Sequence, residues 1–410
     1  MSVAWKEKRL KFAAPDARVL LPQRPAGARY IGLENIESGT GRLLLETEQE
    51  QVDSTVAAFD ERAVLFGKLR PYLAKVAAPD FAGVASTEIM VFRPAPDTDR
   101  RFLAYSLLSD GFIKRISSMV DGAKMPRANP DDVLNMRLVL PSLNEQRRIA
   151  AWLDEKTAKV DRLLAMRRSQ IEIIDEQRRS IIQEVVTRGL DPAVSVMDSG
   201  LPALGQIPAH WEMKELRYLV PQDRQIMYGI VLPGPNVDDG VPIVKGGNCE
   251  PGRLEMEFMN RTTREIEAGY VRSRLKAGDL VYSIRGSIGA CAIIPPELEG
   301  ANITQDAARI APGKSTHSRF LWYSVNAKYF FSQMDSGAVG ATIRGVNIKD
   351  LKRGVVALPP MHEQIAIADF LDGETSRFDR LRSAYERQIA LLAEYRASII
   401  HEAVTGQIQP

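Results

Sequence analysis

The sequence from Leu140 to Thr187 reads LPSLNEQRRIAAWLDEKTAKVDRLLAMRRSQIEIIDEQRRSIIQEVVT, and it determines the architecture because it occurs twice. The second copy, from Leu358 to Thr405, reads LPPMHEQIAIADFLDGETSRFDRLRSAYERQIALLAEYRASIIHEAVT. The copies align without a gap at an offset of 218 and share 22 of 48 residues. Similarity of this extent indicates an internal duplication, so we expect two related halves.

The block upstream of each copy is also repeated, although it has diverged. Trp5 matches Trp211 at an offset of 206, and Tyr105 matches Tyr323 at an offset of 218. The second block therefore carries a net insertion. We expect the two tryptophans to pack in a core rather than stack on a base, because an indole buries a large apolar area.

Each repeat predicts one long helix. The first repeat has no Pro or Gly between Pro141 and Gly189, and a glycine there is typical of a helix end. Apolar residues recur at steps of three and four, which is the heptad pattern of a coiled coil. The heptad positions hold Val160, Leu164, Arg167, Ile171, Ile174, Arg178, Ile181 and Val185 in one copy, and Phe378, Arg382, Tyr385, Ile389, Leu392, Arg396, Ile399 and Ala403 in the other.

We expect the two helices to pair as an antiparallel intramolecular coiled coil. At 1.5 Å per residue, the stretch from Leu153 to Val185 would form a rod about 50 Å long. Arg178 and Arg396 are equivalent. Three interpretations of these arginines remain open. They could set the register of the helix pair, they could face a partner subunit, or they could extend their charged ends toward water.

The two upstream blocks, called modules below, predict mixed helix and sheet. Short apolar runs between Gly and Pro residues predict strands at Val64–Phe66, Ile89–Phe92, Leu280–Ile284 and Ala290–Ile294. Phe102–Val120 and Ser318–Met334 predict helices. The predicted fold class is α+β, with modules at 1–140 and 191–357 and helical spacers at 141–190 and 358–410. Asp191–Pro208 is interpreted as a linker into the second module.

Composition excludes several classes of protein. Cys249 and Cys291 are the only cysteines and there are four histidines, so neither a zinc cluster nor a disulfide framework is expected. No apolar run reaches the roughly 18 residues of a membrane span. The segment Met1–Lys11 is rich in charged residues and does not resemble a signal peptide. We expect a cytoplasmic protein.

Candidate catalytic motifs lack the context that their chemistry needs. Pro312–Ser315 has Ala308 where a phosphate-binding loop needs its first glycine. Asp154 and Lys156 have no second acid nearby and are interpreted as a solvated helix face. Asn129-Pro130 is followed by two aspartates rather than by the proline and aromatic residue of a methyltransferase loop. We expect no catalytic residues, no bound cofactor and no metal in this chain.

The repeat carries a recognisable pattern. Leu-Pro-x-x-x-Glu-Gln-x-x-Ile-Ala, the heptad helix with Asp-Arg-Leu, and the closing Ser-Ile-Ile-x-Glu-x-Val-Thr resemble the conserved regions of specificity subunits from Type I restriction-modification systems. Val64–Tyr72, which reads VLFGKLRPY, is similar to a segment of their target-recognition domains. The likeness extends over the whole chain.

This resemblance implies a function and partners. Each module would be a target-recognition domain that reads one half of a split, asymmetric sequence in double-stranded DNA. The paired helices would form a fixed spacer and dock two methyltransferase subunits, and restriction/translocase subunits would join them. S-adenosylmethionine, ATP and magnesium are expected on those partner subunits.

Base reading favours Arg, Lys, Asn or Gln on exposed turns. The candidates are basic residues on such turns together with interleaved polar residues: Lys68, Arg70, Tyr72, Lys124, Arg127 and Asn129 in the first module, and Arg285, Ser287, Thr342, Arg344, Asn347 and Lys349 in the second. About half of such charges are expected to be ordinary surface residues, since most protein–DNA contacts go to the backbone. Asn129 and Asn347 are shared by both copies, so helix capping is the better interpretation of that pair.

The net charge bears on how tightly the chain would bind DNA. The whole chain carries +2, and its four parts carry +2, +2, +1 and −3 in chain order. We therefore expect weak non-specific binding by the isolated chain and tight binding only with partner subunits. The alternative is a standalone DNA-binding or scaffold protein without restriction partners. A nuclease is disfavoured because no acid cluster is present.

Overall fold

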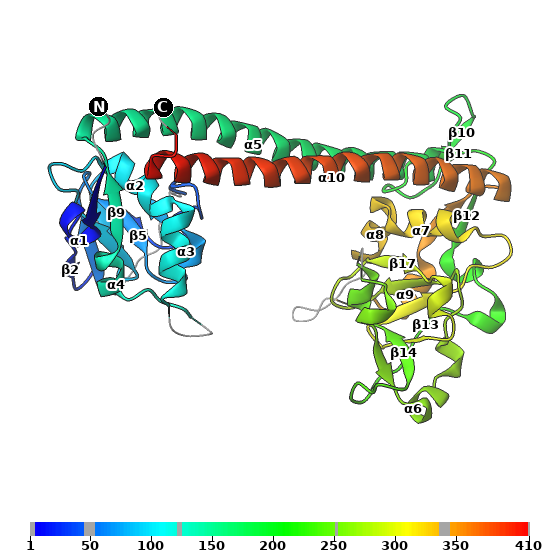
Figure 1. Ribbon diagram of the computed structural model, residues 1–410. Helices are drawn as coiled ribbons and strands as arrows, with labels where there is room; N and C mark the ends of the chain where they lie inside the picture. Colours follow the sequence, from blue (N-terminus) through cyan, green and yellow to red (C-terminus); the bar gives the residue numbers. More distant parts are fainter. Residues whose placement is uncertain (1–4, 45–53, 121–124, 251–252, 336–344, 409–410) are drawn as a thin grey trace. The chain divides into compact units, whose positions relative to one another are not determined.

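The computed structural model describes residues 5–44, 54–120, 125–250, 253–335 and 345–408 (Figure 1). The chain forms two compact units. Unit 1 comprises Met1–Ser169 and Tyr385–Pro410, and unit 2 comprises Gln170–Ala384. Each unit therefore contains one module together with part of each long helix.

The two repeats fold as the two long helices, α5 (Leu143–Arg188) and α10 (Met361–Thr405). A glycine with positive φ follows close on each helix, Gly189 at 76° and Gly406 at 78°. This left-handed conformation ends a helix and costs glycine little. The two predicted helices, and the predicted end of the first at Gly189, are thus confirmed.

In unit 1, the first part of α5 packs against the last part of α10. Ile149 and Leu153 share a buried cluster with Ile400 and Val404. Further along α5, the Arg167 guanidinium lies 5.1 Å from the centre of the Tyr385 ring. Residues later in α5 contact residues earlier in α10. The pair is therefore antiparallel, as predicted.

Unit 2 repeats this pairing with the remaining halves of the helices. Asp175 accepts a hydrogen bond of 3.3 Å from Arg382, and Val186 shares a buried cluster with Ile367 and Leu371. The pairing is again antiparallel. Of the apolar heptad positions on α5, Val160, Leu164, Ile174 and Val185 are buried.

Small sheets build the first module. Its strands are ordered β1–β9, β6–β5–β8 and β2–β4–β7–β3, and only the pair β3–β7 is parallel. Their bounds are β1 (Lys6–Arg9), β2 (Val19–Leu21), β3 (Tyr30–Ile31), β4 (Val56–Phe59), β5 (Val64–Gly67), β6 (Val76–Ala77), β7 (Gly83–Ser86), β8 (Ile89–Phe92) and β9 (Arg137–Leu140). The helices of the module are α1 (Leu10–Ala13), α2 (Arg100–Leu108), α3 (Asp110–Ser118) and α4 (Pro130–Asn135).

The second module has a related set of sheets, ordered β12–β20, β13–β19–β16–β17, β15–β14–β18 and β10–β11. The strands are β10 (Val196–Asp198), β11 (Gln206–Pro208), β12 (Glu212–Glu215), β13 (Met227–Tyr228), β14 (Val241–Val244), β15 (Asn260–Thr262), β16 (Leu280–Ser283), β17 (Cys291–Ile293), β18 (Asn302–Ile303), β19 (Ala307–Ile310) and β20 (Val355–Leu358). The helices are α6 (Arg264–Ala268), α7 (Ser318–Asn326), α8 (Lys328–Asp335) and α9 (Ile348–Arg353). The four strands predicted from the sequence correspond to β5, β8, β16 and β17.

Two sequence-based interpretations need correction. The helices predicted at Phe102–Val120 and Ser318–Met334 are each two helices, because Ser109 and Ala327 have extended ψ angles of 141° and 151° that interrupt the helical hydrogen bonding. The segment Asp191–Pro208, interpreted as a linker into the second module, is itself folded. It contains the β10–β11 hairpin, and Ile207 is buried in the core of unit 2.

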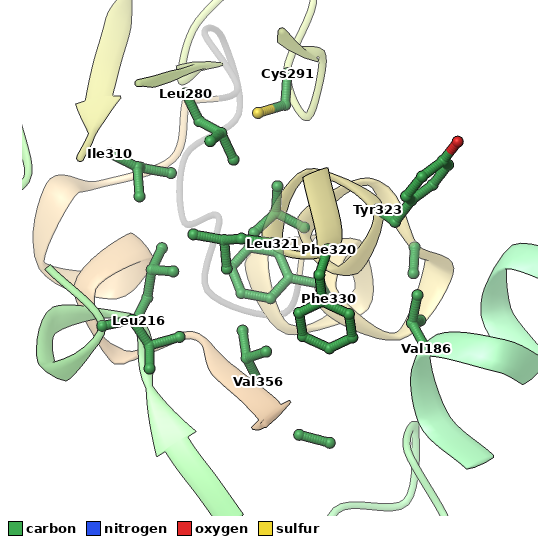
Figure 2. Packing of buried hydrophobic residues seen from close by; sticks show 14 of the residues in the cluster. Val186, Leu216, Leu280, Cys291, Ile310, Phe320, Leu321, Tyr323, Phe330 and Val356 are labelled. Carbon is green, nitrogen blue, oxygen red and sulfur yellow. The ribbon is translucent and has the colours of Figure 1, made fainter. Parts of the chain in front are cut away.

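The core of unit 2 lies between α7, the sheets and the end of α5. Figure 2 shows Phe320 and Leu321 of α7 among Leu216 and Val356, with Val186 of α5 on the side of Tyr323. Both module-opening tryptophans pack in a core, as predicted. Trp211 belongs to this cluster, and Trp5 packs on the corresponding cluster of unit 1.

Candidate nucleic-acid interface

In unit 1, the turn that follows β5 brings predicted DNA-binding residues together. The Arg70 N–H donates to the Pro126 carbonyl at 2.7 Å, and the Ala128 N–H donates to the Lys68 carbonyl at 2.8 Å. These bonds tie the turn to the segment that precedes α4. Lys68, Arg70, Tyr72 and Arg127 therefore come from two separate stretches of sequence and form one surface.

The backbone of this turn is held in an uncommon conformation. Arg70 has φ 51° and Ala74 has φ 47°, and both lie in the left-handed region. Between them Pro71–Leu73 forms a short 3-10 helix, and Tyr72 is 55% exposed. Residues other than glycine are strained in the left-handed region. They persist there only where the surrounding structure enforces the conformation, often at binding sites. The observation favours a functional turn.

The cations of this surface differ in their availability. The Arg127 Nε donates to Glu88 Oε2 at 3.2 Å, so this guanidinium is already paired with an acid. Arg70 is exposed, and its guanidinium has no ion pair or hydrogen bond with any residue in the described ranges. Arg70 is therefore a cation of the turn that remains available to an external anion or base edge.

The turn after β16 in unit 2 is built in the same way. Its backbone bridges the segment before α9, because the Val346 N–H donates to the Ile284 carbonyl at 2.9 Å and Arg285 pairs with Gly345. Gly286 has φ 72° and occupies the third position after the strand, as Arg70 does in unit 1. The two modules thus share the turn although their side chains differ.

Arg285 is the available cation of the second turn. It is exposed, and within the part of the chain that the structure describes its guanidinium has no partner. Ser287 is partly buried, and its hydroxyl donates to Glu250 Oε1 at 2.6 Å. The second turn therefore presents one unpaired arginine next to a serine–glutamate pair.

The shared asparagines cap helices. The Asn129 side chain accepts from the Asp131 N–H at 3.0 Å, and the Asn347 side chain accepts from the Lys349 N–H at 2.9 Å. The capping interpretation is confirmed. Lys349 is exposed at the start of α9. The predicted DNA-binding residues Lys124, Thr342 and Arg344 lie outside the described residues.

Other basic residues near these segments serve the fold. Arg101 binds Asp154 at 2.5 Å, and Arg274 binds the buried Glu267 at 2.6 Å. The hydrogen bonds from Arg274 lower the pKa of the Glu267 carboxyl and keep it charged. Because Asp154 on α5 binds Arg101 of the first module, it is not simply a solvated acid.

The candidate catalytic motifs have structural roles. In the Pro312–Ser315 loop, the Gly313 N–H donates to the Leu219 carbonyl and the Ser315 carbonyl accepts from Gln364. Burial raises the pKa of the Cys249 thiol to about 12, which disfavours a thiolate. In the described ranges no three His, Cys, Asp or Glu side chains are grouped so that they would hold a metal ion.

The sequence patterns did not predict the residues whose backbone carbonyls hold the start of each turn. The Glu88 carbonyl accepts from the Lys68 N–H at 2.9 Å, and the Asp306 carbonyl accepts from the Ile284 N–H at the same distance. Glu88 and Asp306 are 218 positions apart. The repeat offset was therefore the signal that pairs them, although these bonds use backbone atoms and do not depend on the acidic side chains.

Comparison with known proteins defines the class of the chain. The family model of the Type I restriction modification DNA specificity domain matches residues 34–172 and again residues 242–390. The two matches cover more than half of the sequence, so this chain belongs to that family. Each match contains one of the turns described above. None of the helices in the described part of the chain is long and apolar enough to cross a bilayer.

Curated relatives carry the same description. The specificity subunit of the Type I restriction enzyme EcoBI from Escherichia coli is 24% identical over 315 residues, which are 76% of this chain and 66% of the relative. The MjaVIII specificity subunit from Methanocaldococcus jannaschii is 24% identical over 334 residues, 80% of this chain and 74% of the relative. The match thus spans about two thirds of the first relative's length.

Solved structures show the same fold. A chain from a study of complex assembly and conformational transition in the type I R-M system has a TM-score of 0.77 at 22% identity, and the match covers 99% of this chain and 98% of that chain. The HsdS subunit from Thermoanaerobacter tengcongensis has a TM-score of 0.51 at 20% identity, with 99% and 97% covered. The predicted fold class is therefore confirmed.

Proposed function

We propose that this chain is the subunit of a Type I restriction-modification complex that reads a split DNA target, one half with each module. The single observation that carries this proposal is the duplicated turn, which presents an unpaired exposed arginine at nearly the same place in both modules. Arg70 and Arg285 occupy these turns. The proposed modules are 1–140 and 191–357, and the proposed spacers are 141–190 and 358–410.

The side chains around the turns suit base reading in the major groove. An arginine forms two parallel hydrogen bonds to guanine, and each such pair contributes about 1–3 kcal/mol of discrimination. The proposed DNA-binding set is Lys68, Arg70, Tyr72, Lys124, Arg127, Arg285, Ser287, Thr342, Arg344, Asn347 and Lys349. Because Tyr72 and Glu88 surround one turn while Ser287 and Glu250 surround the other, the two halves of the target would differ in sequence.

The helix pair would act as the spacer between the half-sites. A continuous helix is a stiff element whose length is set by its residue count, at 1.5 Å per residue. The 46 residues of α5 and the 45 residues of α10 are helical throughout. An asymmetric target with a gap of constant length is the expected consequence.

Exposed apolar residues on the same helices suit the docking of two identical partners. Leu163 on α5 is equivalent to Leu381 on α10, and Ile173 is equivalent to Leu391, all at an offset of 218. All four are at least 41% exposed. Unit 1 contains Leu163 and Leu391, and unit 2 contains the other two. Exposed apolar side chains among charges mark interaction sites, so each unit would bind one methyltransferase subunit.

The chain would contribute recognition and not catalysis. Adenine methylation would be performed by the methyltransferase subunits with S-adenosylmethionine, and ATP-dependent cleavage by restriction subunits with magnesium. Such partners and their chromosomal target set the cytoplasm as the expected location. The near-zero net charge supports dependence on partners, because non-specific affinity for DNA rises with the number of phosphates neutralised.

Reconstitution tests this proposal. The isolated chain, and the chain co-expressed with its methyltransferase subunit, are incubated with DNA and labelled S-adenosylmethionine. The complex should methylate DNA at one split motif, and the isolated chain should transfer no methyl group. Methyl transfer by the pure isolated chain contradicts the proposal. Tight sequence-specific binding by the chain alone, with no methyltransferase retained, supports the standalone DNA-binding alternative.

A further inference from the structure

Each module is attached to its long helix by a duplicated set of polar contacts. Anchor 1 consists of Arg101, Tyr105, Gln146, Asp154 and Thr157 in unit 1. Anchor 2 consists of Arg319, Tyr323, Gln364, Asp372 and Thr375 in unit 2. Every residue of anchor 2 lies 218 positions after its counterpart in anchor 1. The two sets were thus retained together while the modules diverged.

The glutamine is the most buried member of each anchor. Gln146 is fully buried near the start of α5. Its oxygen accepts from the Asp99 N–H at 2.7 Å, and its NH₂ donates to the carbonyls of Asp97 and Pro141 at 3.0 and 2.9 Å. One side chain therefore joins the start of the helix to the backbone that leads into α2.

Gln364 makes the same three bonds in unit 2. Its oxygen accepts from the His317 N–H at 2.8 Å, and its NH₂ donates to the carbonyls of Ser315 and Pro359, both at 2.9 Å. The residues that it contacts differ from Asp97 and Asp99 in unit 1. The bonds nevertheless persist because they use main-chain atoms, which are present whatever the side chain.

A tyrosine on the module forms the second point of attachment. The Tyr105 hydroxyl donates to Asp154 Oδ1 at 2.8 Å, and the Tyr323 hydroxyl donates to Asp372 Oδ1 at the same distance. Burial raises the pKa of both phenols, so each hydroxyl keeps the proton that it donates. Arg101 binds Asp154 as well, and Arg319 binds Asp372.

These contacts leave little rotational freedom between a module and its helix. A buried amide with all its partners in the main chain loses hydrogen bonds if the module tilts, and buried polar groups without partners are strongly disfavoured. The tyrosine contact lies about two helical turns further along the helix, since Asp154 follows Gln146 by eight residues. Two separated points of attachment fix a direction, whereas one point permits pivoting.

We infer that Gln146 and Gln364, with the hydroxyls of Tyr105 and Tyr323, are positioning residues that restrict the complex to one gap length between its half-sites. This inference rests on the proposed reading of a split target. One extra base pair turns the second half-site by about 35° around the duplex. Firmly anchored modules do not follow that rotation, whereas modules with loosened anchors do.

The test uses the full chain in complex with its methyltransferase subunit. Four variants are compared with the wild type. Three are double variants: Gln146→Leu with Gln364→Leu, Tyr105→Phe with Tyr323→Phe, and the exposed control Gln23→Leu with Gln305→Leu. The fourth is a triple variant that adds Arg70→Ala to the two glutamine changes. The readout is the set of methylated sites in genomic DNA, sorted by half-site sequence and by gap length. Assembly of each complex is checked by its mass.

The glutamine variant should keep both half-site sequences and methylate sites whose gap is one base pair longer or shorter. We expect methylation at those sites to rise about tenfold or more. This change corresponds to losing about one hydrogen bond of the free energy that discriminates the normal gap from the altered gaps. The tyrosine variant should broaden the gap to a smaller extent. Adding Arg70→Ala should relax one half-site without changing the broadened gap, and the control should match the wild type.

Contradictory results are distinguishable from a failure of the proposed function. If the wild type methylates no split motif, the proposed function fails. If the wild type has a split motif and the assembled glutamine variant keeps a single gap at the normal rate, the positioning role is wrong and the proposed function stands. If the glutamine variant does not assemble, the tyrosine variant decides: a single unchanged gap overturns the inference, and a broadened gap supports it.

Discussion

Arg396 on α10 binds Asp161 on α5 with 2.8 Å between Nε and Oδ1, and the equivalent residues Arg178 and Asp379 lie 3.7 Å apart. Arg396 is buried and also donates to the carbonyls of Gly39 and Thr40. The Arg178 Nε is buried but has no hydrogen-bond partner among the described residues. The duplicated position therefore joins the two helices by a hydrogen-bonded ion pair in unit 1 and by a longer ion pair in unit 2, and only in unit 1 does it also hold a loop of the module.

This difference predicts unequal effects of truncation. Arg396→Ala leaves a carboxylate and two carbonyls without their donor, so it should cost about 2–3 kcal/mol of the local stability of unit 1. Arg178→Ala should cost less than about 1 kcal/mol in unit 2, because a long, partly exposed ion pair contributes little. Hydrogen exchange of residues 37–42 and of the ends of α10 measures both. Equal losses of protection in the two units would contradict the assignment.

The turns predict effects on DNA recognition that are confined to one half-site each. Arg70→Ala should weaken methylation at the wild-type motif and relax the base preference of one half-site, at a cost of about 1–3 kcal/mol. Arg285→Ala should do the same for the other half-site. Sequencing of methylated sites measures both variants. Arg62→Ala, at another exposed position of the first module, serves as the control. A uniform loss across all sequences would indicate phosphate contacts instead.

The backbone of the second turn predicts a difference between its two glycines. Gly286→Ala places a methyl group in open space at φ 72° and should cost about 1 kcal/mol, the strain of the left-handed region. Gly289→Ala has φ 90°, and its new methyl carbon would lie 2.6 Å from the Phe331 ring, so it should cost more. Denaturant unfolding of the two variants compares them. A Gly289→Ala variant as stable as Gly286→Ala would show that Phe331 moves aside freely.

The exposed leucines predict the stoichiometry of the complex. Leu163→Glu with Leu391→Glu alters only unit 1 and should give a complex with one methyltransferase subunit instead of two. Leu381→Glu with Ile173→Glu should have the same effect through unit 2. Leu232→Glu, at a position that is 79% exposed within the second module, is the matched control. Native mass spectrometry counts the subunits. Retention of two subunits by both double variants would place the docking surface elsewhere.

The sequence predicted the long elements well because their signals are repeated and periodic. The offset of 218 and the heptad steps gave α5 and α10 and their antiparallel pairing. Gly189 marked the end of the first helix. A pattern that occurs twice, and that repeats many times within each copy, is difficult to misassign.

Local backbone geometry was harder to predict. Ser109 and Ala327 interrupt two helices, yet neither residue is a strong helix breaker, so helix propensity alone does not predict the interruptions. The hairpin in Asp191–Pro208 was missed because its two three-residue strands are too short to show an apolar alternation.

The candidate site was predicted in part. Single-sequence patterns indicated Arg70 and Arg285 on exposed turns, but they did not show that each turn is bonded to the segment before α4 or α9. They also did not distinguish Arg101, which binds Asp154, from an arginine available to DNA. Both distinctions depend on contacts between residues distant in sequence, which composition and spacing do not encode.

The central claim is that the two modules read a split DNA target. The most direct test is to map adenine methylation in the genome of a host that expresses only this chain and its methyltransferase subunit. We predict a single adenine-methylated motif that consists of two different halves separated by a gap of constant length. A continuous motif, two halves of identical sequence, or no methylation by an assembled complex would contradict it.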